Sequence, residues 1–156
     1  MGKAMCIKSF SPGIKSGDWV HAANLQYTDK KWLLAWQHEY VGKSYIAEVG
    51  YVPRNNYIKI NPKVGYTIFP KKGKVLSHGP QLSSTYYFNK NFYHTDNETF
   101  LDYKISFRNQ AVFDAWIAHD YVELLRPFDP TVSGKDTLAT GTKHSWNSWG
   151  TVYASK

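Results

Sequence analysis

The stretch TFLDYKISF, residues 99–107, is the segment that decides the fold class most directly. Its side chains alternate in character, with Leu101 and Tyr103 apolar and Asp102 and Lys104 charged. A β-strand sends successive side chains to opposite faces of a sheet, so strict alternation predicts a strand with one apolar and one polar face.

The same alternation recurs on the N-terminal side of this stretch. WVHAANLQY (19–27), KWLLAWQHEYV (31–41) and STYYF (84–88) all show it, and turn residues such as Gly42 separate the segments. Many short strands at regular spacing are typical of all-β folds. We therefore predict a mainly β protein, an antiparallel sandwich or barrel of roughly 8–10 short strands.

One segment breaks the alternation, and we predict a helix there over about residues 109–120, packed on the sheet. Val112, Trp116 and His119 recur at intervals of three and four, which is the spacing of one helix face. Asn109 stands where a helix N-cap is expected.

The chain of 156 residues suits one domain. We predict a β-rich domain over residues 1–130. Residues 131–156 are expected to form a Ser/Thr/Gly-rich loop with a closing C-terminal strand of the same domain. Trp146 and Trp149 lie in that segment and are too apolar for a simple linker.

The net charge of +7 is concentrated in the first part of the chain. Residues 1–90 contain 13 Lys/Arg and 4 Asp/Glu. Such a surplus favours an anionic partner such as a carboxylate, sulfate, phosphate or membrane surface. Only three of the cations are Arg, which disfavours a dedicated reader of nucleic-acid bases.

A ligand surface is predicted around residues 51–75, which carry tyrosines, lysines and turn residues but no acid. Flat Tyr or Trp rings suit the apolar side of a sugar, while amides and lysines suit its hydroxyls and acidic groups. We therefore expect a non-catalytic, soluble, lectin-like module that binds a glycan or another anionic or polyhydroxylated ligand. The predicted ligand-binding residues are Tyr57, Lys59, Arg54, Asn55, Asn56, Trp146 and Trp149.

Two other functions remain open from the sequence. A nucleic-acid-binding protein or small basic nuclease would stack bases on the same rings, with lysines along the phosphates. A membrane-active or structural protein would place Tyr, Trp and Lys in the lipid headgroup zone.

No catalytic, metal or cofactor site is predicted. The six histidines show no metal-ligand spacing, and neither a G-x-S-x-G motif nor a phosphate loop is present. Cys6 is the single cysteine, so no intramolecular disulfide is expected. No signal peptide and no apolar run of about 20 residues is visible, so we expect no transmembrane segment and a cytoplasmic protein or one released without a signal. The oligomeric state is left open.

Overall fold

The computed structural model describes residues 2–8, 19–43, 56–124, 127 and 140–153. These residues form eight β-strands and no helix. The strands are β1 (Gly2–Lys8), β2 (Trp19–Thr28), β3 (Trp32–Val41), β4 (Tyr57–Tyr66), β5 (Val75–Asn89), β6 (His94–Phe107), β7 (Val112–Leu124) and β8 (Gly141–Tyr153).

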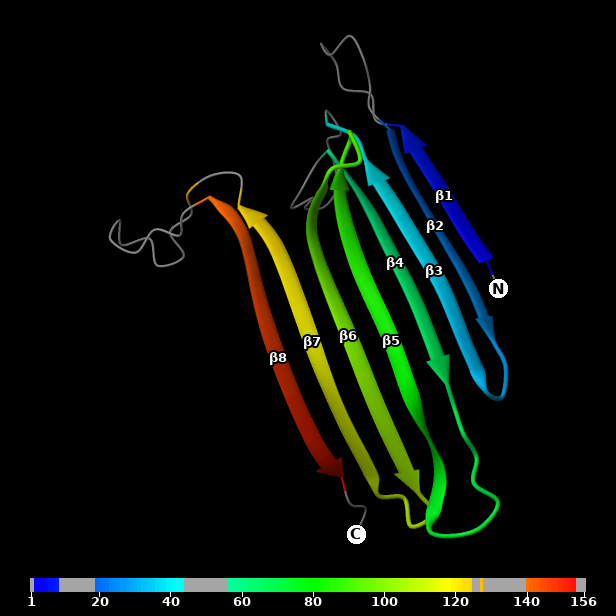
Figure 1. Ribbon diagram of the computed structural model, residues 1–156. Coiled ribbons are helices and arrows are strands. Elements are labelled where there is room, and N and C mark those ends of the chain that lie inside the picture. The colour runs from blue at the N-terminus through cyan, green and yellow to red at the C-terminus, as the bar shows by residue number, and fades with distance from the viewer. Residues whose placement is uncertain (1, 9–18, 44–55, 125–126, 128–139, 154–156) are drawn as a thin grey trace.

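The eight strands make one antiparallel sheet whose spatial order is the order of the chain, from β1 to β8. Figure 1 shows β1 and β8 at opposite edges of an open, curved sheet. The predicted antiparallel β class is confirmed. The predicted sandwich or barrel is not present within the described part of the chain, which has no second sheet and no pairing between β1 and β8.

The predicted helix over residues 109–120 is wrong, because β7 occupies this segment and pairs with β6 and β8 on its two sides. Asn109 caps a turn instead of a helix. Its Oδ1 accepts a hydrogen bond from the Ala111 backbone at 3.2 Å, and Gln110 takes a positive φ of 69°. An Asn side chain bonds nearby backbone N–H groups in both settings, which is why the sequence signal was ambiguous.

Two prolines lie inside long strands. Pro62 stands in the middle of β4 opposite Trp36 of β3, although residues 61–63 resemble a turn in the sequence. Pro80 lies in β5 opposite Tyr103 of β6. The strands are therefore longer than their turn-like residues indicate, and β5 extends over 15 residues.

The C-terminal residues 141–153 form β8, which pairs with β7 along its whole length. β8 is an edge strand, and nearly all of its side chains are exposed. Most of the predicted Ser/Thr/Gly-rich loop, residues 131–139, lies outside the described part of the chain.

The buried core of the described residues is small. Val20, Val41 and Ala118 are the hydrophobic side chains that are buried there. In those residues there is also no helix of the length and apolar character needed to cross a membrane. A single sheet with so little interior leaves most of its large apolar side chains at the surface.

Candidate functional site

The pairing register divides the side chains of the sheet into two sets. Paired residues of antiparallel strands project from the same face, and neighbours along a strand project from opposite faces. Leu82, Leu101 and Ile117 are paired in sequence across β5, β6 and β7, and they define the apolar face. Gln81 and Asp102 are paired one position away and lie on the opposite face, the polar face.

The centre of the apolar face is a row of aliphatic side chains in register across five adjacent strands. Each of these side chains is between 38% and 47% exposed. We call this set the aliphatic row: Leu34, Val64, Leu82, Leu101 and Ile117. An apolar patch of this extent on a sheet is unusual for a free surface and indicates a covered one.

Aromatic and histidine rings border the aliphatic row on the side of the β5–β6 turn. The rings of His94 and Tyr121 stack at 4.8 Å, and Tyr121 meets His144 at 5.2 Å. His119 lies 4.5 Å from the ring of Trp146. We call the whole set the first ring belt: His21, Tyr40, Tyr86, Phe88, His94, His119, Tyr121, His144 and Trp146.

A second ring belt borders the aliphatic row on its other side, and comprises Trp32, Tyr66, His78 and Tyr103. The rings of Trp32 and Tyr66 are 4.6 Å apart. His78 Nδ1 and the Tyr103 hydroxyl lie 2.6 Å apart. Along β5, Tyr86 of the first belt and His78 of the second are eight positions apart, which corresponds to about 27 Å of strand.

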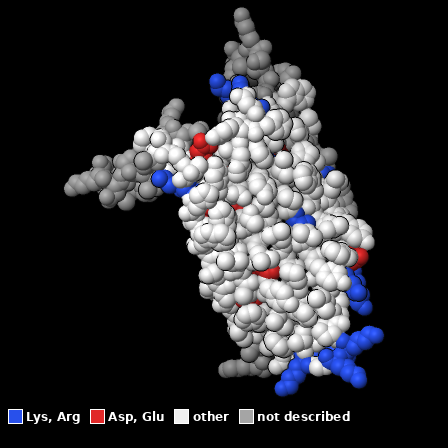
Figure 2. Space-filling model, viewed as in Figure 1, with Lys and Arg blue, Asp and Glu red and all other residues white. Residues whose placement is uncertain are grey.

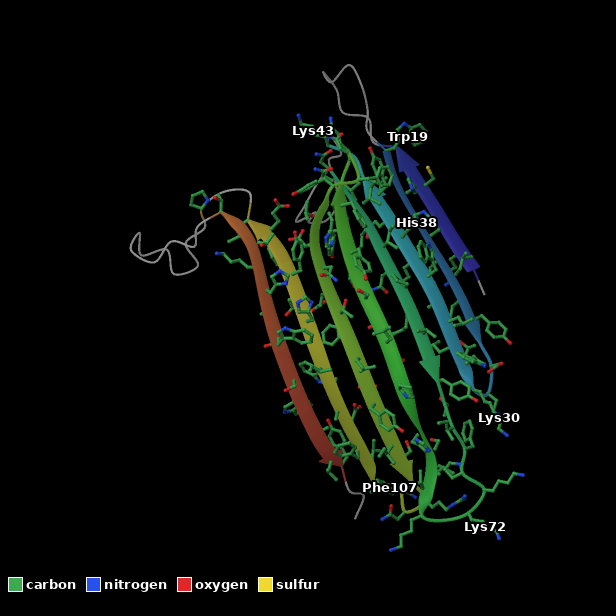
Figure 3. All side chains as sticks on the ribbon, in the orientation of Figure 1. Trp19, Lys30, His38, Lys43, Lys72 and Phe107 are labelled. Carbon is green, nitrogen blue, oxygen red and sulfur yellow. The ribbon has the colours of Figure 1, made fainter. Side chains whose placement is uncertain are left out.

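Beyond the second ring belt, the turns form a cationic end of the sheet. Figure 2 shows blue atoms gathered at this end, and Figure 3 places Lys30 and Lys72 there, with Lys43 at the opposite end. The cations of these turns are all exposed: Lys30, Lys31, Lys71, Lys72, Lys74 and Arg108.

The cationic end is held together by hydrogen bonds between side chains and backbone groups. Arg108 Nε donates to the Gly73 carbonyl at 3.0 Å, which ties the β6–β7 turn to the β4–β5 loop. Asp29 is the single acid of these turns, and its Oδ1 accepts backbone N–H groups of Trp32 and Lys31, each at 2.6 Å. These bonds hold the pKa of Asp29 below its usual value. Asp29 therefore shapes the turn and leaves the surplus positive charge of this end in place.

The polar face carries charges of both signs. Burial, a hydrogen bond with Asp114 and the charge of Asp114 raise the pKa of Asp102. Charged side chains on this face are Lys3, Glu39, Lys59, Lys63, Asp96, Glu98, Asp102, Lys104, Asp114, Asp120 and Lys143. On the apolar face, Glu123 at the end of β7 is the one Asp, Glu, Lys or Arg whose side chain the structure describes.

Some of the predicted ligand-binding residues come together on the polar face. Tyr57 and Lys59 share it, and the Tyr57 hydroxyl donates to Glu39 Oε1 at 2.8 Å. Lys59 Nζ lies 5.8 Å from the centre of the Tyr87 ring. Asn56 immediately precedes β4 with a positive φ of 63°. Arg54 and Asn55 lie outside the described residues.

The other predicted ligand-binding residues are separated from these and from each other. Trp146 and Trp149 are three positions apart on β8, so they project from opposite faces of the sheet. Both are exposed, at 68% and 58%. They belong to β8, at the far edge of the sheet from β4, so the seven predicted residues do not form one site.

Sequence reasoning missed the aliphatic row and the ring belts. The signal was available in the alternation of each strand, but the register that aligns five strands is a property of the folded sheet. No group of three or more His, Cys, Asp or Glu side chains in the described segments has the geometry of a metal site. Comparison of the chain with family models, curated proteins and solved structures gives no match.

Proposed function

We propose that this protein works at a lipid bilayer, with the apolar face of its sheet packed against acyl chains. The observation that carries this proposal is the aliphatic row, five aliphatic side chains in register and all substantially exposed. Full burial of an exposed aliphatic side chain is worth about 1.5–3 kcal/mol. Because 38–47% of each side chain in the row is exposed, a lipid cover adds roughly 1 kcal/mol for each.

The two ring belts support a lipid cover over a protein cover. Tyr, Trp and His rings join an apolar body to a polar group and are favoured where hydrocarbon meets water. The belts are about 27 Å apart along β5 and border the aliphatic row on both sides. Aliphatic side chains flanked by such rings suit contact with acyl chains just below the headgroups.

The cationic end supports an anionic membrane surface. Its six cations stand in the turns beyond the second ring belt, where lipid headgroups lie if the aliphatic row contacts acyl chains. A Lys or Arg near an anionic bilayer contributes about 1 kcal/mol of attraction. Part of the positive charge of the sequence is therefore placed where it would contact anionic lipid headgroups.

A second copy of the chain is the main competing cover for the apolar face. Two sheets packed through their apolar faces would form the sandwich that the sequence predicts. This arrangement would place the histidines of the first ring belt, such as His119 and His144, inside a dry protein interface. It would also give the cationic end no partner, so we favour the bilayer.

Tryptophan fluorescence tests this proposal directly. One variant retains only Trp36, on the apolar face, and a second retains only Trp116, on the polar face, with Phe at the other tryptophan positions. With lipids brominated on the acyl chains, we expect Trp36 to lose more than half of its emission and Trp116 to lose little. Equal quenching of the two, or a lipid-free dimer in which Trp36 is unquenched by added vesicles, would overturn the proposal.

A further inference from the structure

A groove of about 510 Å³ lies on the polar face over β1 to β4, away from the apolar face and the cationic end. This volume is within the range of small-molecule sites. Its lining residues are Lys3, Ala22, Ala23, Asn24, Gln37, His38, Glu39 and Lys59. Of these, Ala23 and His38 send their side chains to the apolar face and contribute backbone.

The two rims of the groove carry lysines. Lys3 comes from β1 and Lys59 from β4, so three interstrand steps, about 14 Å, separate their backbones. The ammonium groups of two lysines at such a separation suit a ligand with acidic groups at more than one position along its length. A single small anion would engage one rim only.

Between the lysines, the groove offers hydrogen-bonding groups of both kinds. Asn24 and Gln37 are directly paired across β2 and β3, and each amide both donates and accepts. Glu39 accepts the Tyr57 hydroxyl at 2.8 Å and retains further acceptor capacity. Donors and acceptors side by side are what vicinal hydroxyl groups require.

The floor of the groove is small and apolar. Ala22 is two positions before Asn24 on β2 and projects from the same face. Its small methyl group lets a sugar ring lie close to the sheet. Among the described residues that line the groove, none presents an aromatic side chain on which a nucleobase could stack.

We propose that this groove binds an acidic saccharide, with Lys3 and Lys59 pairing with its carboxylates and Asn24, Gln37 and Glu39 binding its hydroxyls. The site is different from the surface assigned to lipid and does not depend on it. Of the residues that the sequence singled out for a glycan, Lys59 lines this groove, while Arg54 and Asn55 lie outside the described part of the chain.

Isothermal titration of the full-length chain with trigalacturonic acid tests the site, with neutral maltotriose as the comparison. We expect the uronide to bind at least tenfold more tightly than maltotriose. Lys59→Met and Lys3→Met are each expected to weaken uronide binding about tenfold, because each removes a charge-assisted hydrogen bond. Lys104→Met, on the same face but outside the groove, is expected to leave binding unchanged.

The contrary results are equally defined. Absence of uronide binding, or equal affinity for maltotriose, overturns the acidic-saccharide assignment. Wild-type affinity in both Lys59→Met and Lys3→Met overturns the location. Circular dichroism of each variant shows whether the sheet is intact, and Lys3→Met alters an exposed side chain of an edge strand, where loss of folding is not expected.

Discussion

The backbone of Tyr66 lies directly against Gly79, so that a Cβ atom on Gly79 would overlap the Tyr66 carbonyl group. This contact joins the end of β4 to β5 next to the bridge between Ile68 and His78. Backbone atoms on both sides prevent an easy adjustment. Glycine is therefore required here for the close approach of two chain segments and not for an unusual φ.

The first prediction concerns this contact. Gly79→Ala is expected to destabilise the fold by roughly 2–4 kcal/mol, because β4 and β5 must separate to admit the methyl group. Thermal unfolding followed by circular dichroism measures the effect. Gly150→Ala is the matched control, since a Cβ there meets Ala115 Cβ and the Asp114 carbonyl oxygen at an ordinary 3.7 Å. Equal stability of the two variants would contradict the prediction.

The second prediction tests the aliphatic row. Leu82→Lys places a charge in the middle of the apolar face, and a charge in hydrocarbon costs about 2.5–3.5 kcal/mol. Partition into vesicles is therefore expected to fall roughly a hundredfold in a flotation assay. Gln81→Lys adds the same charge one position away on the polar face and is expected to have little effect. The proposal fails if both variants partition alike.

The third prediction concerns the cationic end. Replacing Lys71, Lys72 and Lys74 together by Gln removes three charges and is expected to weaken binding to anionic vesicles roughly a hundredfold at low salt. The difference should shrink as salt is raised, because ions screen exposed charges. The double variant Lys43→Gln and Lys90→Gln alters the opposite end of the sheet and serves as the control. A larger loss in this control than in the triple variant would show that the orientation is wrong.

The fourth prediction follows from the raised pKa of Asp102, which burial and then its contacts with Asp114 cause. A carboxyl with a raised pKa in the folded state binds its proton more tightly there than in the unfolded chain. Stability therefore falls as the pH rises from the ordinary Asp range through the folded pKa. Asp102→Asn removes this loss and should stabilise the protein at pH 7 by at most about 0.5 kcal/mol, because both side chains are only partly buried and solvent screens their repulsion.

Unfolding of wild type and Asp102→Asn between pH 4 and pH 8 measures that difference. The two stability curves should approach each other on the acid side and separate towards neutral pH. Parallel curves, or a less stable Asn variant at pH 7, would contradict the assignment of Asp102 as a group that favours its protonated form.

The strand class was readable from the sequence because alternation is local. Leu101 and Tyr103 project from one face of β6, while Asp102 and Lys104 project from the other, as the sequence predicts. Alternation does not say what covers the apolar side. Leu101 is 47% exposed, so the face that a sandwich would bury is open.

The wrongly predicted helix and the wrongly predicted break in β4 have a common cause. The side chain of Asn109 accepts hydrogen bonds from backbone N–H groups in a turn as readily as at the start of a helix. Residues 109–120 are therefore compatible with either a helix or a turn followed by a strand. Pro62 lacks an N–H group, yet β4 continues through it because its neighbours on both sides keep their pairing with β3. In both segments, pairing with the neighbouring strands determines the secondary structure, and a short stretch of sequence does not show that pairing.

The sequence predicted suitable types of ligand-binding residue, but it did not predict which of them the folded sheet brings together. Tyr57 and Lys59 share a face because they are two positions apart, which the sequence shows. Trp146 and Trp149 are three positions apart and separate onto opposite faces of β8. The groove between Lys3 and Lys59 joins β1 to β4, and no sequence window contains both residues.

The strand order of the sheet also has a kinetic consequence. Each strand pairs only with its neighbours in the chain, so no step of assembly needs distant segments to meet. Loop closure between strands that are neighbours in the chain costs less entropy than closure between distant strands. The sheet can therefore assemble by adding one hairpin after another. Each partly assembled sheet already exposes part of the apolar face to water.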